Sequence, residues 1–441
     1  MRLRITDKFD SFYFIGIGGV SMSGLAKYLL KLGKKVGGSD ILPNEYTEEL
    51  IKAGAFVTIE PEVDSVKDYD LIVYTDAIKD TDVRLCEAKK LSKEIMSRGQ
   101  FLYEISRNFK KVIAVSGCHG KTTCSAMLTH IFAAAGKKFA SHIGGNDSFY
   151  SNFYFCGNDF FITEACEYRK NFLLLKPSVA VILNSDSDHL ECYGSESELR
   201  RAYLQFANDA GLAITLYRDL PVSHGVSFGF DKFADYYAKN ITYSDGKYSF
   251  FVYEDKTELG NVHLNVYGKH NVLNAIAATA VARSVGISFC DIRKGIESFN
   301  GVGRRFEKIG TVNGAPCIAD YAHHPNELRA VIRTVKKITK GKIYVVFQPH
   351  TYSRTKNLFK QFVNVLSHVD NLLIYKTFAA REYYDDAGSA LTLSQSIKKS
   401  RYGDGVLDII NFISKAEAGD NILFLGAGDI YYIAKRCVSE F

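Results

Sequence analysis

The residues most able to do chemistry stand in one short stretch, VIAVSGCHGKTTCSA, at positions 112–126. An apolar, β-branched run ends there in two glycines, a lysine and two threonines, and a helix-favouring segment follows. The backbone N–H groups of such a turn, the positive end of a helix dipole and a lysine ammonium together suit a polyphosphate. The stretch therefore predicts a nucleotide triphosphate site. Its residues are Gly117, Cys118, His119, Gly120, Lys121, Thr122 and Thr123.

The spacing of this turn departs from the usual phosphate-binding pattern, G-x-x-x-x-G-K-[ST]. Val115 stands five residues before Gly120, and the nearest earlier glycine is Gly117. Thr122 still occupies the position at which a hydroxyl would ligate magnesium. A tight turn beside a solvated lysine is the structural alternative. Two glycines, a lysine and two threonines behind a β-branched strand favour the phosphate site instead.

Acidic and imidazole side chains follow two further predicted strands of the same segment. Glu164 and Glu167 come at the end of one strand, and Asp188 and His189 follow the next. Because ligands collect at the carboxyl ends of parallel strands, we expect these groups beside the phosphate loop, where they could complete a magnesium site. The alternatives are a solvated loop acid at Glu167 and a hydrogen-bonded core histidine at His189.

The elements that must position these residues alternate between strand and helix patterns along the whole chain, which is typical of an α/β fold. The periodic pattern restarts near the phosphate loop and again after an arginine-containing segment, so we expect three domains. They are a Rossmann-like domain at 1–108, a central P-loop α/β domain at 109–308 and a Rossmann-like domain at 309–441.

An aromatic, alternating pattern interrupts the central segment between residues 224 and 267. Ser244, Asp245 and Gly246 form a hairpin signal within it. The pattern predicts an antiparallel insertion that carries no chemistry.

The first strand-to-helix turn, G-I-G-G-V-S, holds two glycines of the dinucleotide fingerprint, Gly16 and Gly18, with Gly19 beside them and Ser21 at the third position. Asp40 ends the second predicted strand at the spacing where an acidic residue meets a ribose or a base edge. From these residues alone, a nicotinamide cofactor, a uridine diphosphate group and a plain turn all stay open.

Other polar residues stand at predicted element ends. Asn271 could cap its helix or bind a nucleotide, and capping is the default. Arg304 and Arg305 lie in a predicted hinge, where arginine could reach phosphate oxygens on domain closure; a surface pair is the alternative. Polar clusters also follow three strands of the last third, which we expect to border a cleft. These clusters occupy residues 320–325, 348–355 and 377–385.

The composition narrows the class of protein. A chain of 441 residues, 46% of them hydrophobic, can bury the cores of two to three domains. Its net charge of +6 is spread along the chain, so we expect no nucleic-acid partner. No apolar run reaches the roughly 18 residues of a membrane span, so we expect no membrane insertion. Nine irregularly spaced cysteines and the absence of a signal-peptide pattern predict reduced thiols and a cytoplasmic location.

Together, these motifs resemble those of the Mur ligases of peptidoglycan synthesis over nearly the full chain. The stretches that carry the resemblance are GIGGVSMSGLA, SGCHGKTT, EACEYRKNFL, NSDSDHL, GKHNVLNA, GVGRRFE, DYAHHPNE and QPHTYSRT. The shortened phosphate loop is also the family's form. The branch that joins L-alanine to UDP-N-acetylmuramate is the most similar. The resemblance implies ATP-dependent amide bond formation through an acyl phosphate, with Mg²⁺. We expect a monomer or a weak homodimer.

The resemblance also implies a role for each candidate residue. Lys121 would hold the β- and γ-phosphates, Thr122 and Glu167 would ligate one magnesium ion, and His189 would ligate a second. Contacts with ATP are implied for Asn271, Arg305 and Asp320. Catalysis would depend on Lys121, Glu167, His189 and Arg305. Gly18, Gly19 and Asp40 would lie nearest the uridine diphosphate group, in place of a nicotinamide. His350, Arg354 and Arg381 are candidates for the acyl phosphate and the alanine carboxylate.

Two features depart from the family's pattern. Residues 195–212 hold no lysine, whereas many Mur ligases that add later residues carry a carbamylated lysine there. The acidic D-E-S-D run is replaced by C-E-Y-R, so Glu164 competes with Glu167 as the metal ligand. Glu167 is preferred because Phe172 and Leu173 follow it at the family's offset.

Three other functions compete with alanine ligation. One is a ligase that reattaches recycled tripeptide to UDP-N-acetylmuramate, and another is a catalytically silent UDP-sugar or ATP sensor. The third is a Rossmann dehydrogenase.

Overall fold

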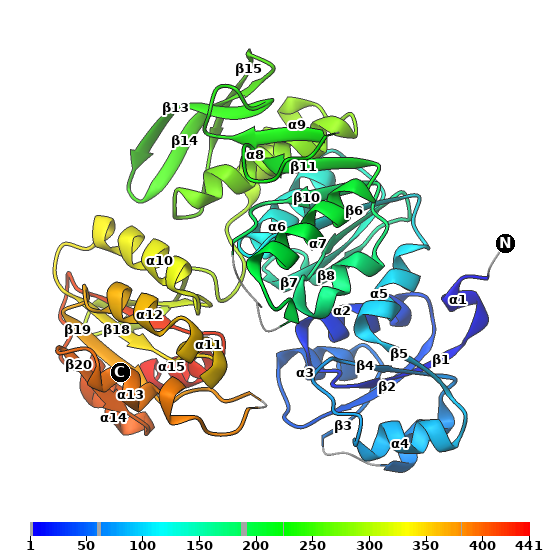
Figure 1. Cartoon of the computed structure of the whole chain (residues 1–441), viewed down its shortest axis with the longest axis horizontal. Helices are drawn as coiled ribbons and strands as arrows, with labels where there is room; N and C mark the ends of the chain where they lie inside the picture. The colour runs from blue at the N-terminus through cyan, green and yellow to red at the C-terminus, as the bar shows by residue number, and fades with distance from the viewer. Residues whose placement is uncertain (1–2, 60–62, 187–191, 224, 381) are drawn as a thin grey trace. The chain divides into compact units, whose positions relative to one another are not determined.

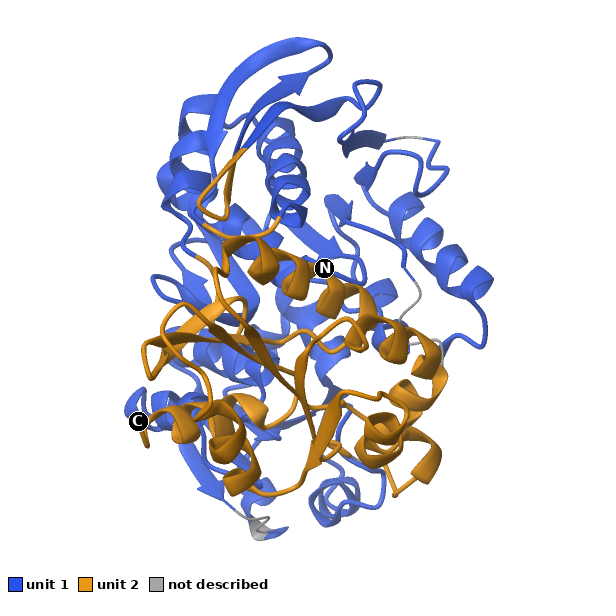
Figure 2. Cartoon of the chain, turned by 90° about the vertical axis from the view of Figure 1, so that its left-hand side faces the viewer, with its two compact units in different colours: residues 1–242, 249–265, 269–300 blue, residues 243–248, 266–268, 301–441 orange. Residues whose placement is uncertain are grey.

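The chain folds into three β-sheets that form two compact units, as the computed structural model shows (Figures 1 and 2). The structure describes residues 3–59, 63–186, 192–223, 225–380 and 382–441. Unit 1 comprises residues 1–242, 249–265 and 269–300, and unit 2 comprises residues 243–248, 266–268 and 301–441. The predicted α/β fold is confirmed.

The first sheet, in unit 1, is five-stranded and parallel, in the order β3-β2-β1-β4-β5. Its strands are β1 (Ser11–Ile15), β2 (Lys35–Asp40), β3 (Phe56–Ile59), β4 (Leu71–Tyr74) and β5 (Glu94–Ser97). Its helices are α1 (Ile5–Lys8), α2 (Val20–Lys31), α3 (Glu45–Lys52), α4 (Val83–Lys90) and α5 (Arg98–Ser106). The strand order reverses between β1 and β4, which is the position where open α/β sheets bind ligands.

The second sheet has ten strands in the order β15-β14-β13-β12-β11-β10-β6-β9-β7-β8. They are β6 (Lys111–Ser116), β7 (Phe139–Asp147), β8 (Ser151–Phe155), β9 (Phe160–Glu164), β10 (Val179–Ile182), β11 (Leu212–Leu216), β12 (Gly225–Gly229), β13 (Tyr236–Ser244), β14 (Lys247–Glu254) and β15 (Thr257–His263). Its helices are α6 (Lys121–Ala134), α7 (Glu196–Asn208), α8 (His270–Ser284) and α9 (Phe289–Ser298).

The predicted antiparallel insertion lies at the β13–β15 end of this sheet. Strands β14 and β15 pair antiparallel. Asp245 and Gly246 connect β13 to β14 with φ values of 51° and 84°, the left-handed backbone that tight hairpin turns require.

One continuous hydrophobic core joins the first two sheets, which explains why they form one unit. Phe14 of β1, Phe161 of β9 and Ile182 of β10 all belong to it. The imidazole of His142 on β7 lies in this joint, and its Nε2 is 3.0 Å from the carbonyl oxygen of Ser21 on α2. Burial lowers the pKa of His142 to about 4, so the ring is neutral at pH 7.

The third sheet, in unit 2, has the order β16-β17-β21-β18-β19-β20, and all its pairings except β16–β17 are parallel. The strands are β16 (Glu307–Val312), β17 (Ala315–Asp320), β18 (Ile343–Phe347), β19 (Asn371–Tyr375), β20 (Ser400–Gly403) and β21 (Asn421–Leu425). The helices are α10 (Pro325–Ile338), α11 (Tyr352–Asn357), α12 (Phe359–Leu366), α13 (Ala390–Gln395), α14 (Val406–Ile413) and α15 (Ile430–Val438).

Side chains of the third sheet alternate between two cores. Val345 and Phe347 of β18 pack with residues of α10, α12 and α13. Tyr344 and Val346, one position along, pack with α14 and α15. Because successive side chains of a strand point to opposite faces, the continuous apolar run of β18 needs helices on both sides of the sheet.

All nine cysteines are thiols, as the sequence predicts. Among the described residues, every helix is too short or too polar to cross a membrane.

Candidate active site

The phosphate-type loop connects β6 to α6 in the central sheet of unit 1. Gly117 and Gly120 adopt φ values of +122° and +88°, which side chains with a Cβ rarely adopt. A Cβ on Gly120 would also lie 2.5 Å from Oδ1 of Asn274 on α8. Both glycines are therefore required by the backbone. The loop delivers Lys121 and Thr122 to the first turn of α6, where helical N–H groups have no partner within the helix.

Lys121 lies at the centre of this site. Its Nζ is 3.0 and 3.1 Å from the two carboxylate oxygens of Glu167, and it donates to the carbonyl oxygens of Gly117 at 2.6 Å and Cys118 at 3.3 Å. Burial by itself would lower the pKa of Lys121, but the charge of Glu167 outweighs it, so the pKa is raised. A half-buried cation thus stands at the N-terminus of α6, in contact with a buried carboxylate.

The two candidate glutamates lie in different surroundings. Glu167 is 1% exposed, its carboxylate contacts Lys121, and its carbonyl oxygen accepts a hydrogen bond from the Tyr193 hydroxyl. Glu164, at the end of β9, accepts the backbone N–H of Gly144 on β7 at 2.5 Å. Of the two carboxylates, the one on Glu167 is therefore the one that contacts the lysine of the phosphate loop.

Residues that follow β10 form hydrogen bonds with the loop between β6 and α6. The side-chain amide of Asn184 accepts from the N–H of His119 at 3.1 Å and donates to the carbonyl oxygen of the same residue at 2.9 Å. The thiol of Cys118 donates to the carbonyl oxygen of Asp186 and lies 3.6 Å from the hydroxyl of Tyr203 on α7. Asn184 is thus a loop-positioning residue that sequence reasoning missed, although its place directly after a strand was a usable signal.

The prediction that Asn271 caps its helix by default is wrong. Helix α8 begins at His270, and its N-cap is Lys269, whose backbone is already helical. Asn271 is therefore inside the helix, buried, and its Oδ1 accepts from Nδ2 of Asn274 at 2.9 Å. Since Asn274 is the residue against Gly120, this pair of amides connects α8 to the phosphate loop.

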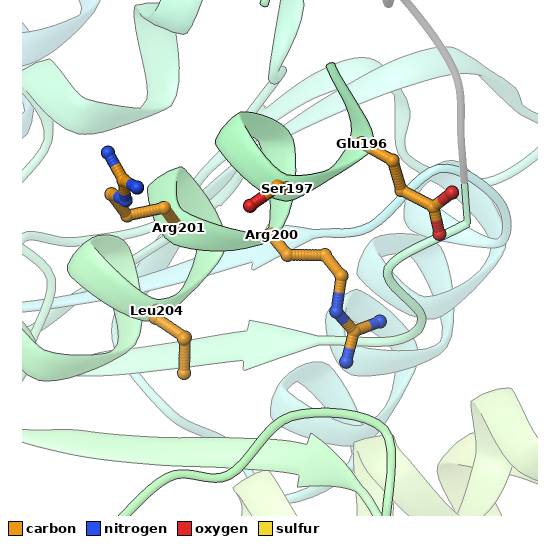
Figure 3. Close-up of a pocket in the computed structure, with 5 residues that line it drawn as sticks. All are labelled: Glu196, Ser197, Arg200, Arg201 and Leu204. Carbon is orange, nitrogen blue, oxygen red and sulfur yellow. The ribbon is translucent and has the colours of Figure 1, made fainter.

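An open hollow of about 520 Å³ lies on α7 (Figure 3). It is lined by Glu196, Ser197, Arg200, Arg201 and Leu204, and contains none of the predicted site residues. The two arginine side chains extend away from each other. Arg200 donates to the Ser185 hydroxyl at 2.7 Å and to the carbonyl oxygen of Asp219, so it braces the segment that supports the phosphate loop.

The turn after β1 brings together the residues predicted for the uridine diphosphate group. The N–H of Gly18 donates to Oδ2 of Asp40 at 2.8 Å, and the carbonyl oxygen of Gly18 accepts from Asn44 at 3.1 Å. A Cβ on Gly18 would clash with both side chains. Gly19 is the N-cap of α2. Gly18, Gly19 and Asp40 therefore lie together at the carboxyl edge of the first sheet.

A second group of candidates lies in unit 2, where Asp320 ends β17. Its carboxylate accepts the N–H groups of Phe306 and Ala322, each at 2.8 Å. Burial raises the pKa of Asp320 to about 6, although Arg305 and the two N–H donors lower it. The guanidinium of Arg305 lies over the ring of Tyr321 at 5.1 Å, and its Nη1 is 3.8 Å from Oε1 of Glu327.

His350 and Arg354 also lie in unit 2, after β18. Nη1 of Arg354 is 3.1 Å from Nδ1 of His350, whose ring stacks on Phe378 and lies 5.7 Å from the ring of His323. Histidine and arginine side chains of the clusters at 320–325 and 348–355 thus lie together at the strand ends of the third sheet, and the cleft that these clusters should border stays a prediction.

Three predicted residues, Asp188, His189 and Arg381, lie outside the described residues. Within the part of the chain that the structure describes, no group of three His, Cys, Asp or Glu side chains could hold a metal ion. The structure therefore brings together the loop residues with Glu167 in unit 1, and Arg305 with Asp320 in unit 2.

Three family models match consecutive parts of the chain. The model of the Mur ligase family catalytic domain matches residues 11–110, that of the Mur ligase middle domain matches 115–282, and that of the Mur ligase glutamate ligase domain matches 304–428.

Full-length relatives agree with these models. The chain is 41% identical to a UDP-N-acetylmuramate–L-alanine ligase of Clostridium acetobutylicum, with 97% of each chain covered, and 38% identical to that of Clostridium beijerinckii, with 98% of each covered. Its fold is similar to the crystal structure of UDP-N-acetylmuramate–alanine ligase from Thermotoga maritima, with a TM-score of 0.85, 29% identity and 98% of each chain covered. The resemblance seen in the sequence is thus confirmed, and the chain belongs to the Mur ligase family.

Proposed function

We propose that this chain catalyses the ATP-dependent ligation of L-alanine to UDP-N-acetylmuramate, with ADP and phosphate as the other products. The observation that carries the proposal is the buried contact of Lys121 with Glu167 at the start of α6. It lies in a chain that is similar over its full length to alanine-adding ligases. A silent sensor would not need a buried carboxylate at this position, and a dehydrogenase would not need the phosphate loop.

The proposed reaction has two steps. The lactyl carboxylate of the sugar attacks the γ-phosphate of ATP, which gives an acyl phosphate and ADP. The amino group of L-alanine then attacks the acyl carbon, the amide bond forms and phosphate leaves. Lys121 neutralises charge on the β- and γ-phosphates, and Arg305 and Asp320 contact ATP from unit 2. This chemistry depends on positioning and charge stabilisation rather than on a protein nucleophile.

Magnesium fits the donors around the loop. Mg²⁺ binds through one or two carboxylates together with substrate phosphates, and it disperses phosphate charge when bound. Glu167 supplies a buried carboxylate, and Thr122 supplies a hydroxyl on the first turn of α6. We assign these two residues to one ion, and His189 to a second.

The remaining assignments follow the same scheme. Residues 1–108 bind the UDP-sugar through Gly18, Gly19 and Asp40, and residues 109–308 bind ATP. Residues 309–441 bind the amino acid, with His350, Arg354 and Arg381 as the candidates for the alanine carboxylate and the acyl phosphate.

Phosphate release by the purified full-length chain tests the proposal. The assay contains ATP, Mg²⁺ and UDP-N-acetylmuramate, together with L-alanine, glycine, L-serine or the murein tripeptide. We expect release with L-alanine that depends on all the other components. Release with the tripeptide alone would assign a recycling ligase, and no release with any acceptor would overturn ligation.

A further inference from the structure

The loop that carries Arg305 has an unusual backbone. Arg304 and Phe306, the residues on either side of Arg305, have φ values of 62° and 51°. Residues other than glycine rarely adopt this left-handed conformation, and it persists only where the surroundings hold it in place. The chain therefore turns sharply on both sides of the arginine that the proposed function places on ATP.

The side chain of Arg304 is held by the last helix of the chain. Its guanidinium carbon lies 4.6 Å from the ring centroid of Tyr431 and 4.7 Å from that of Tyr432, both on α15. Glu307 joins the same cluster: one carboxylate oxygen accepts the N–H of Arg304 at 2.7 Å, and the other accepts the hydroxyl of Tyr431 at 3.1 Å. Tyr431 is buried, whereas Arg304 is half-buried and Tyr432 is 44% exposed, so Tyr431 is the inner ring of this contact.

The other side of the turn is held independently. The ring of Phe306 stacks on Tyr267 with centroids 4.6 Å apart, and its N–H donates to Asp320 at 2.8 Å. The carbonyl oxygen of Arg304 accepts the N–H of Tyr321 at 2.7 Å. Both neighbours of Arg305 are thus held by contacts of their own, and the Arg305 guanidinium lies over the ring of Tyr321.

We propose that Arg304 and Tyr431 are positioning residues for Arg305: the stack of Arg304 on α15 sets where the Arg305 guanidinium lies during phosphoryl transfer. This inference rests on the proposed function. It gives α15 a role in the reaction although none of the residues predicted for the site lies on that helix.

Variants of both residues test the role. Arg304→Asn keeps a residue that tolerates the left-handed backbone but removes the guanidinium, and Tyr431→Leu removes the ring. We expect each to lower kcat about tenfold, with the KM for L-alanine within about twofold of wild type. Arg304→Lys should recover part of the loss, because an ammonium still interacts with the rings. Lys239→Gln, which removes a cation over Tyr253 in the β13–β14 hairpin, is the matched control and should match wild type.

The decisive measurement combines these variants with Arg305→Ala. If Arg304 acts through Arg305, the double variant Arg304→Asn/Arg305→Ala should be within about twofold of Arg305→Ala alone, since coupled residues are not additive. Losses that multiply would overturn the positioning role. Should Arg304→Asn not fold, Tyr431→Leu, which removes the ring under the Arg304 guanidinium, takes its place in the same cycle. An inactive wild type overturns the proposed function itself, whereas an active wild type with multiplying losses overturns this inference alone.

Discussion

Lys121 in unit 1 and Arg305 in unit 2 are both cations beside a glutamate, and the two are held in different ways. Lys121 is 16% exposed and contacts both oxygens of Glu167 as well as two backbone carbonyls. Arg305 is 31% exposed, lies on a tyrosine ring, and has its Nη1 3.8 Å from the carboxylate of Glu327. Backbone carbonyls and the charge of Glu167 hold Lys121, whereas the ring of Tyr321 supports Arg305.

This difference predicts how each group of residues responds when its cation is removed. Removing Lys121 would leave a carboxylate buried without its cation, which costs more than the pair contributes. Removing Arg305 would leave Glu327 with its backbone partners, the N–H groups of His323 and His324, still in place. The candidate phosphate ligand of unit 1 is therefore held by more polar contacts than the candidate of unit 2.

The largest effect is expected from Lys121→Ala. Because the proposed role of the ammonium is to stabilise charge on the transferred phosphate, turnover should fall on the order of a hundredfold or more. Phosphate release measures it, and circular dichroism checks the fold. Lys294→Ala, on the exposed side of α9, is the control. Near-normal release by the Lys121 variant would contradict its place in the site.

The next effect separates the two glutamates. Glu167→Gln should lower turnover roughly tenfold to a hundredfold and raise the Mg²⁺ concentration needed for half-maximal rate, because an amide is a weaker ligand for Mg²⁺ than a carboxylate. Glu164→Gln is the matched variant, since its carboxylate accepts the N–H of Gly144. We expect it to leave the Mg²⁺ dependence unchanged. The reverse result would assign the metal to Glu164.

The phosphate loop could be predicted because its signal is local. Two glycines, a lysine and a threonine within six residues predict both the turn and the binding of phosphate. In the structure, Gly117 and Gly120 adopt backbone conformations that only glycine adopts readily. The pattern of parallel strands also placed Glu167 near the loop, since β9 pairs with β6. Which contacts Glu167 makes could not be predicted, because they depend on side-chain positions.

The residues that support the two groups of candidate residues could not be predicted, because their contacts join distant parts of the chain. The stack of Arg304 on Tyr431 joins residues far apart in a chain with 27 tyrosines, so composition offers no signal for the pair. The cap expected at Asn271 is absent because α8 begins one residue earlier, at His270, and its N-cap Lys269 makes no side-chain capping hydrogen bond. Local patterns thus predict elements and motifs, whereas tertiary packing decides the partners.

A smaller effect should come from Arg305→Lys. Lysine keeps the charge but loses the planar group that stacks on Tyr321, so we expect about a tenfold lower kcat, less than for Arg305→Ala. Steady-state kinetics at saturating ATP measures both variants. Equal losses for lysine and alanine would show that the planar guanidinium alone matters, and no loss in either would remove Arg305 from the reaction.

The smallest effect is a pH dependence at Asp320. With a pKa of about 6, this carboxyl is half protonated at pH 6, so kcat/KM for ATP should rise as pH increases through 6 and reach about half its plateau there. Asp320→Asn should flatten this limb, and the exposed Asp370→Asn should keep it. Because the charge of Arg305 lowers the pKa of Asp320, Arg305→Ala should move the midpoint to higher pH. A midpoint that stays in place or moves to lower pH would mean that the charge of Arg305 does not affect the protonation of Asp320. The two residues would then be separate contacts in unit 2 rather than one coupled site.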